Sequence, residues 1–336
     1  MARHLNTLVM MVCGILGSRR VHLPAIANHA PASGQSESQV MRFRRWLKNE
    51  SIQGEVYFLP FVEHVLASLC HQTLTLVIDG SAVGQGCVCL MVSVIYKKRA
   101  LPLMWVVHKG KKGHFEERLH IELIQAVHEL IPPGSDVVCL GDGEFDGTQW
   151  LKTLDQFGWH YACRTAKTAK FYEDGEEFSI RDITPAQGEC SAVAQVQFTQ
   201  KAYGPVLAVA WWERHYEEPI YLVSNFSLPE EACFSYRKRF RIETFFSDQK
   251  SRGFNLHKSR LNQPQRVSRL MIASCLAYLW IIYLGACVLH TPWQKQIHRA
   301  DRCDLSLFQL GLRYLDYLLR DGVTLPKVDF AMPQLM

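Results

Sequence analysis

The sequence contains no Cys-x-x-Cys pair, no internal repeat and no low-complexity tract. Without closely spaced cysteine pairs a zinc knuckle is not expected. The eleven cysteines are odd in number, and most stand in apolar runs, as Cys139, Cys275 and Cys287 do. They predict reduced thiols in the core of a cytosolic protein.

The charged residues are few enough to be unremarkable in number, but they are unevenly distributed along the chain. Charged residues make up 21% of the 336 residues and the formal net charge is +5, which is ordinary for a soluble globular protein. Residues 235–270 hold ten Lys and Arg against two acids, whereas the rest of the chain holds 27 bases and 30 acids. Either a surface that meets a polyanion or a solvated helix face would account for this basic segment.

Two apolar segments raise the question of a membrane. Residues 8–16 follow Arg3 in the manner of a weak secretory signal, but no A-x-A-like cleavage site comes after them, which favours a buried first helix. Residues 270–289 carry no charge and are long enough to span a bilayer. A chain of this size needs a central helix, so we expect a buried core helix there and no membrane contact, with a membrane span as the alternative.

The order of the patterns predicts an α/β fold. The first 70 residues look helical. From residue 73, three apolar runs rich in β-branched residues predict strands, and a helix, a strand, a helix and a strand follow. Residues 167–232 predict strands without intervening helices, and helical patterns return from residue 236.

Two acids stand where apolar runs end. Asp79 follows "TLVI" and precedes Gly80, and Asp142 follows "VVCLG" and precedes Gly143. Open α/β sheets keep their sites at such positions, although Asp before Gly also makes a simple turn. Because further acids follow within four residues of Asp142, at positions 144 and 146, the second assignment is open by a few residues.

A third acid lies inside the basic segment, in "YRKRFRIETFFSDQK". If this stretch is one helix with about 100° per residue, four polar side chains share a narrow stripe beside the apolar one. These four are Tyr236, Arg239, Glu243 and Lys250. Arg237 and Arg241 then lie on the solvent side. We expect these four side chains to form a functional surface next to the sheet.

Three carboxylates that meet in one place would repel each other strongly, unless a divalent cation neutralises them. Oxygen ligands suit Mg²⁺ or Mn²⁺, and two such ions can support in-line attack at phosphorus. A polyanionic substrate also needs nearby cations, which the same segment supplies. We therefore interpret Glu243 as a metal ligand whose basic neighbours hold DNA.

These residues resemble the signature of bacterial insertion-sequence transposases of the family-four type. The shared pattern is Tyr236, two residues, Arg239, three residues, Glu243, six residues and Lys250, preceded by Asp79 and Asp142. The resemblance covers roughly residues 70–290. It implies an α/β fold with an RNase H-like, retroviral-integrase-like catalytic core, an all-β insertion and a small helical N-terminal region.

The sequence patterns divide the chain into segments, and the resemblance, which matches the first 70 residues only in general character and the last 46 hardly at all, implies roles for individual residues. The expected segments are a helical, candidate DNA-binding region (1–70), the first part of the core (71–166), the insertion (167–232), the second part of the core (233–290) and a helical tail (291–336). The expected metal ligands are Asp79, Asp142 and Glu243. The expected DNA contacts are Tyr236, Arg239 and Lys250, with Arg237 and Arg241 beside them. In relatives a Trp stacks on a flipped base, and Trp105, Trp211 and Trp212 are candidates.

The activity that the resemblance implies is cut-and-paste transposition with Mg²⁺ (or Mn²⁺). Water attacks first and frees a 3′-OH, which then attacks target DNA, in some relatives after a hairpin intermediate. The implied partners are the transposon ends and target DNA, bound by a dimer in the synaptic complex, in the bacterial cytoplasm at the nucleoid. Two alternatives stay open: an RNase H-like nuclease without strand transfer, and an inactive, domesticated transposase that binds DNA.

Overall fold

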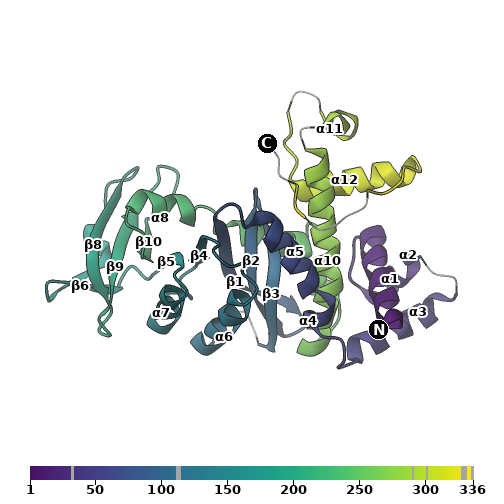
Figure 1. The fold of residues 1–336 in the computed structure, drawn as a ribbon, viewed down its shortest axis with the longest axis horizontal. Helices are drawn as coiled ribbons and strands as arrows, with labels where there is room; N and C mark the ends of the chain where they lie inside the picture. The colour runs from purple at the N-terminus through teal and green to yellow at the C-terminus, as the bar shows by residue number, and fades with distance from the viewer. Residues whose placement is uncertain (32–33, 111–114, 290, 300–301, 327–330, 334–336) are drawn as a thin grey trace.

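The structure is a computed structural model that describes residues 1–31, 34–110, 115–289, 291–299, 302–326 and 331–333. Its centre is one ten-stranded sheet of order β3-β2-β1-β4-β5-β10-β9-β8-β6-β7. Helices α6 and α7 lie along one side of the sheet, and the N- and C-terminal helices gather beyond β3 (Figure 1). The protein is therefore a mixed α/β fold, as the sequence predicts.

The five elements described before the sheet are all helices, as expected for residues 1–70. They are α1 (Ala2–Ser18), α2 (Leu23–His29), α3 (Ser36–Lys48), α4 (Gly54–Tyr57) and α5 (Leu59–Leu69). Their apolar faces join the core: Met11, Phe43 and Val62 are fully buried. The apolar run at residues 8–16 thus forms part of a packed helix, in agreement with the interpretation as a buried first helix.

The next elements follow the predicted order of three strands, helix, strand, helix and strand. They are β1 (Leu74–Gly84), β2 (Cys87–Tyr96), β3 (Arg99–Lys109), α6 (Glu117–His128), β4 (Val137–Gly141), α7 (Thr148–Gln156) and β5 (His160–Arg164). Strands β1, β2 and β3 pair antiparallel, whereas β1, β4 and β5 pair parallel. The helical crossovers that parallel pairing requires are α6 and α7.

Residues 167–232, expected as an all-β insertion, contribute the remaining strands. These are β6 (Lys170–Glu173), β7 (Glu176–Ser179), β8 (Cys190–Phe198), β9 (Tyr203–Trp211) and β10 (Ile220–Ser224), with the short 3₁₀-helix η1 (Ile180–Ile183) after β7. Strand β10 pairs antiparallel with β5, so these insertion strands (β6–β10) extend the same sheet. Helix α8 already begins inside this segment, at Pro229.

The expectation of one helix from Tyr236 to Lys250 is wrong. Helix α8 (Pro229–Tyr236) ends where that helix should begin, and α9 (Arg241–Gln249) starts five residues later. Between them, backbone N–H groups donate to carbonyls three residues back, for example Arg239 to Tyr236 and Ile242 to Arg239. Tyr236 and Ile242 are both buried, yet in one straight helix they would face about 120° apart. The tighter turn allows both to reach the core.

The last helices are η2 (Leu256–Lys258), α10 (Pro264–Val288), α11 (Pro292–Ile297) and α12 (Leu307–Arg320). Among the described residues, α10 alone is a single helix long and apolar enough to cross a membrane, and the bent pair α1 and α2 passes the same test together. However, 83% of the most apolar window of α10 is buried inside the protein. Helix α12 crosses α10 where Gly285 meets Gly311, so closely that a Cβ on either would strike backbone oxygen. α10 is therefore packed as the expected core helix.

Candidate active site

A cavity of about 760 Å³ lies where helix α9 faces β1 and the end of β4. Four acids line it, together with two cations. The lining residues are Asp79, Gly80, Ser81, Val88, Phe115, Asp142, Glu144, Arg239, Glu243, Phe246, Ser247, Lys250 and Ser251. The three acids that the sequence singles out thus meet at one cavity, although 163 residues separate the first from the last.

Asp79 lies within β1 and not at its end, because β1 continues to Gly84 in its hairpin with β2. What ends near Asp79 is the parallel pairing of β1 with β4, whose last partners are Val77 and Leu140. Asp79 Oδ1 accepts a hydrogen bond of 2.7 Å from the N–H of Gly80. Burial, reinforced by the charge of Asp142, raises the pKa of the Asp79 carboxyl to about 6.

Asp142 directly follows β4, as the sequence predicts, and its Oδ1 accepts a hydrogen bond of 3.1 Å from the N–H of Glu144. Glu144 also lines the cavity, and its Oε1 accepts the N–H of Phe115 and lies 3.5 Å from Nε2 of the buried His120. By contrast, Asp146 accepts a hydrogen bond from Thr165 and lines another cavity. Of the two nearby acids, Glu144 therefore accompanies Asp142 and Asp146 does not.

Arg239 connects two of the acids. Its Nη1 lies 3.6 Å from Asp79 Oδ2, and its Nη2 donates to Glu243 Oε1 at 2.5 Å. Glu243, in the first turn of α9, is 42% exposed, whereas Asp79 and Arg239 are each 16% exposed. The guanidinium thus neutralises part of the repulsion between the two carboxylates.

Lys250 reaches the same cavity from the other end of α9. It caps the C-terminus of the helix, and its Nζ donates to Ser81 Oγ at 2.6 Å. Ser81 follows Asp79 by two residues on β1, so the two side chains point to the same face of the strand. The cation of Lys250 is thereby held beside the acids.

The other sequence-predicted DNA contacts lie outside the cavity lining. Tyr236 is buried, and burial raises the pKa of its hydroxyl although Arg239 lowers it. Arg237 forms an ion pair with Glu213, and its guanidinium carbon lies 5.0 Å from the centre of the Trp211 ring. Arg241 lines a second cavity of about 470 Å³. The signature residues thus divide between the acid cavity and its surroundings.

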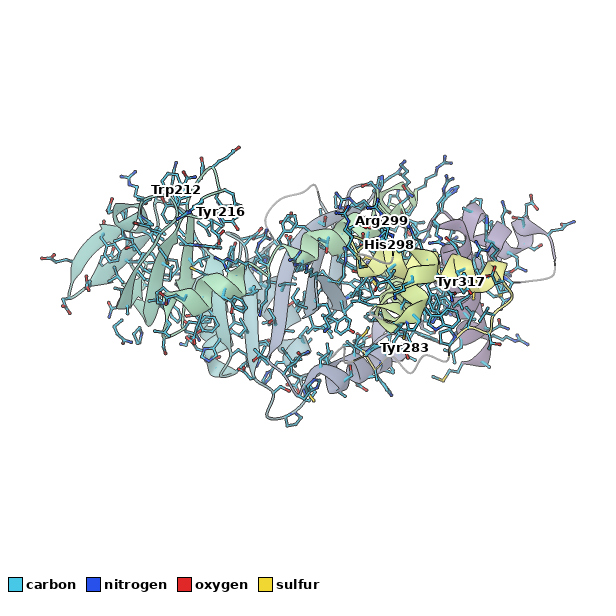
Figure 2. The ribbon with its side chains drawn as sticks, turned by 90° about the horizontal axis from the view of Figure 1, so that it is seen from above. Trp212, Tyr216, Tyr283, His298, Arg299 and Tyr317 are labelled. Carbon is cyan, nitrogen blue, oxygen red and sulfur yellow. The ribbon has the colours of Figure 1, made fainter. Side chains whose placement is uncertain are left out.

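The three candidate tryptophans are not among the described residues that line the acid cavity. Trp105 donates from Nε1 to Ser268 Oγ at 3.0 Å. Trp211 is buried, and Trp212 donates from Nε1 to the carbonyl of Tyr216 at 3.0 Å. Figure 2 shows Trp212 and Tyr216 together on the insertion, far from the labelled residues of the C-terminal helices.

The donor chemistry of the cavity fits a hard divalent cation. All its candidate ligands are carboxylate or hydroxyl oxygens, and the mutual repulsion that helps to raise the pKa of Asp79 is what a cation relieves. Within the described ranges, however, no three His, Cys, Asp or Glu side chains are close enough to hold a metal ion as they stand. A cation that binds Asp79 Oδ2 and Glu243 Oε1 would compete with the Arg239 guanidinium, which contacts both oxygens.

The sequence reasoning missed several residues of the cavity, although local spacing marks some of them. Ser81 follows Asp79 at strand period, and Ser247 follows Glu243 by one helical turn. Phe115 reaches the cavity from a distant part of the chain, ahead of α6, and its ring lies close to Gly80, where a Cβ would come within 2.9 Å of it. No local pattern could have indicated that contact.

Comparison with known proteins identifies a matching family model and solved structures with similarity to this chain. The family model described as "Transposase DDE domain" matches residues 71–280. The piggyBac transposase, in a cryo-EM structure of its synaptic complex with hairpin DNA, superposes with a TM-score of 0.50 at 10% identity, over 98% of this chain and 74% of that one. Human ENDOV superposes with a TM-score of only 0.26 at 13% identity, over 70% of this chain and 96% of that one. No curated protein matches the sequence.

Proposed function

Because the chain belongs to the family of proteins with a transposase DDE domain, we propose that it is a transposase that moves an insertion sequence by a cut-and-paste route. The observation that carries the proposal is the single cavity shared by Asp79, Asp142 and Glu243, with Arg239 and Lys250 in its wall. Acids from β1, the end of β4 and α9 are brought to one place next to cations. This combination suits a reaction at the phosphodiester bonds of DNA.

The fold supports an RNase H-like core as the frame of this site. The strands in the order β3-β2-β1-β4-β5 include an antiparallel meander, β1 to β3, and a parallel set, β1, β4 and β5. The first two acids belong to the adjacent strands β1 and β4, and the third comes from a helix that packs on β1. The piggyBac likeness supports a transposase fold at the level of architecture.

We assign the acids as ligands of Mg²⁺ or Mn²⁺. When bound, such ions supply an activated oxygen nucleophile and stabilise the departing oxygen. Asp79, Asp142 and Glu243 would hold them, and Glu144 lies in the same wall. The phosphate of the substrate would attract Arg239 away from the carboxylates that it now contacts, because a guanidinium also pairs with phosphate in bidentate fashion.

The remaining residues act on the DNA. Lys250, anchored by Ser81, would hold a non-bridging oxygen of the scissile phosphate, and Arg239 would hold another. Attack by water breaks the bond from phosphorus to the 3′ oxygen and leaves a 3′-OH at the end of the element. That hydroxyl then attacks a phosphorus of the target and displaces its 3′ oxygen. The number of phosphodiester bonds is unchanged in the second step, so strand transfer needs no energy source.

DNA is the proposed partner, both as element ends and as target. Two element ends must be brought together, which favours a dimer in the synaptic complex. The piggyBac structure contains hairpin DNA, and a hairpin during excision is one of the routes that our proposal allows. Trp105, Trp211 and Trp212 would then approach a flipped base only after rearrangement, since none of them is among the residues lining the cavity described here.

The test is a strand-transfer assay with the full chain. A linear DNA that carries the inverted repeats flanking the gene is mixed with a target plasmid and Mg²⁺. We expect cleavage at the ends and insertion into the plasmid. Glu243→Gln should bind the DNA but neither cut nor join it, whereas the control Glu176→Gln, at an exposed position of β7, should behave as the wild type.

The other outcomes separate the alternatives. Cleavage without insertion would indicate a nuclease. Binding without cleavage by the wild type would indicate an inactive, domesticated transposase. If Glu243→Gln cuts as fast as the wild type, the assignment of Glu243 as a metal ligand is wrong.

A further inference from the structure

Cys190 of the insertion and Cys233, directly after the insertion in sequence, meet at the protein surface, unlike the core thiols that the sequence led us to expect. Cys190 is the first residue of β8 and is exposed, and Cys233 lies on α8 and is 5% exposed. Their Sγ atoms are 3.7 Å apart, although the two cysteines are 43 positions apart in sequence. The remaining cysteines are buried or half-buried, and seven of the eleven lie on other strands and helices of the core.

The packing around the pair explains why the two thiols meet. Cys190 pairs across the sheet with Trp211 of β9, and α8 packs on both β8 and β9. Figure 1 shows α8 lying across the insertion strands. At the end of α8, Arg237 lies over the Trp211 ring. The packing of α8 on β8 and β9, together with the Arg237–Trp211 contact, thus holds the helix on this part of the sheet.

The two thiols differ in exposure, and their contact shifts their pKa values in opposite directions. A hydrogen bond from the Cys233 thiol lowers the pKa of Cys190 below its usual value, although burial opposes this effect. The pKa of Cys233 is raised, first by the same hydrogen bond and then by burial. Thiolate character and exposure determine which cysteine an oxidant attacks. Cys190 is therefore the thiol that reacts first, and Cys233 is in place to resolve the product.

We propose that Cys190 and Cys233 are a site of reversible disulfide formation by peroxide. The Cys190 thiolate attacks one oxygen of hydrogen peroxide, forms a sulfenic acid and releases hydroxide, which takes up the proton from the original thiol to give water. The Cys233 thiol then attacks the sulfenic sulfur, the S–S bond forms and a second water leaves. Two thiols lose two electrons and two protons, and one peroxide is reduced to two waters.

The bond needs little movement. A disulfide has its sulfurs about 2.05 Å apart, so the two Sγ atoms, now 3.7 Å apart, must approach by less than 2 Å. The product would fasten α8 to the start of β8. Because α8 ends at Tyr236 and leads through Arg239 into α9, the cross-link would restrain the segment that enters the acid cavity. The proposal concerns thiol chemistry and does not rest on the function proposed above.

The test is peptide mapping of the reduced full chain after treatment with hydrogen peroxide. Free thiols are blocked, the chain is digested without reductant, and cross-linked peptides are identified by mass spectrometry. Lys201 and Arg214 lie between the cysteines, so trypsin separates them. We expect a Cys190–Cys233 peptide that dithiothreitol removes, and a melting temperature that rises with oxidation and falls again on reduction.

Matched variants make the result specific. Cys190→Ser should abolish both the linked peptide and the shift in melting temperature. Cys233→Ala should instead accumulate sulfenic acid on Cys190, which a dimedone label detects. Cys70→Ser removes a half-buried thiol that donates a hydrogen bond to the carbonyl of Ala67. This variant should leave the Cys190–Cys233 cross-link unchanged.

Three results would overturn the proposal. The first is a Cys190–Cys233 peptide that forms equally well in the urea-unfolded chain, since proximity in the fold would then play no part. The second is oxidation of other cysteines while this pair stays reduced. The third is a Cys233→Ala chain with no more sulfenic acid on Cys190 than the wild type.

Discussion

Strands β2 and β4 are buried over nearly their whole length, whereas most positions of β8, among the insertion strands, are exposed or half-buried. Helices cover the strands of the first part of the sheet, β1 to β5. The acids there lie at the cavity beside β1 and β4. In the insertion, β9 and β10 are largely buried, but many positions of the outer strands β6, β7 and β8 meet solvent, as an antiparallel sheet allows. The same sheet thus offers a confined site for charge at one place and an open surface at another.

The ion pairs of the two parts differ accordingly. Arg239 and Asp79 are each 16% exposed, whereas Lys170 and Glu177 of the insertion are 47% and 45% exposed. Exposed pairs contribute little to stability, because water and salt screen them. Partly desolvated carboxylates have shifted pKa values and bind cations strongly. Substitutions at the cavity should therefore have large effects, and those facing the insertion should have small ones.

The largest effect is expected at Asp142. Asp142→Asn removes a carboxylate from the cavity, and loss of metal-assisted stabilisation of several kcal/mol should reduce single-turnover DNA cleavage by about 10³-fold or more. Asp146→Asn is the control, since Asp146 accepts a hydrogen bond from Thr165 and lines a different cavity, which lies beside the insertion. It should slow cleavage by less than about tenfold. The reverse ranking would move the second catalytic acid to Asp146.

The position of Asp142 is an example of what could be predicted from the sequence. The apolar run before Asp142 ends in Asp-Gly, and a buried parallel strand followed by a turn explains both features. Such local patterns were enough to predict the order of elements in the first part of the sheet. They were also enough to place Asp142 at its rim.

Other features depend on contacts that local patterns do not contain. The break between α8 and α9 arises because Tyr236 and Ile242 both reach the core, and helical periodicity alone predicts one continuous helix. The pairing of β10 with β5 joins strands more than fifty residues apart, so the insertion could not be assigned to the same sheet beforehand. The position of Arg239 between two acids follows from that same break.

The second effect concerns stability and pH. The pKa of Asp79 is raised from 3.8 to about 6 in the folded protein, mainly by burial. Its contribution to stability is therefore complete below pH 3.8 and is lost as the pH rises through about 6. At about 1.4 kcal/mol per pH unit, ionised Asp79 costs about 3 kcal/mol at pH 8. In urea unfolding with EDTA, Asp79→Asn should be more stable than the wild type at pH 8 and equal to it near pH 3.5.

The control for Asp79 comes from the insertion. Glu177 is exposed, and its hydrogen bond from Lys170 lowers its pKa. Glu177→Gln should therefore leave the unfolding curve at pH 8 unchanged. An equal gain in stability for both variants would mean that net charge, and not the burial of Asp79, governs the pH dependence.

A smaller effect is expected when the guanidinium between the acids is removed. Arg239→Ala should strengthen Mn²⁺ binding in the absence of DNA by roughly tenfold, about 1.4 kcal/mol. The substitution removes the guanidinium that competes with Mn²⁺ for the carboxylates of Asp79 and Glu243. Electron paramagnetic resonance of free Mn²⁺ measures this directly. Arg237→Ala, which breaks the pair with Glu213 on the insertion side, should leave Mn²⁺ affinity unchanged. Weaker Mn²⁺ binding by Arg239→Ala would show that Arg239 helps to build the metal site.

The smallest effects are expected at the tryptophans. The Trp212 Nε1 group donates to the carbonyl of Tyr216, and Trp105 packs with its ring centre 4.8 Å from that of Phe58. Because neither ring is among the residues lining the acid cavity, Trp105→Phe and Trp212→Phe should change single-turnover cleavage by less than about threefold, below 0.7 kcal/mol. A loss above tenfold for Trp212→Phe alone would mean that the insertion closes over the DNA during cleavage. The open surface of the sheet would then take part in the chemistry that we assign to the confined one.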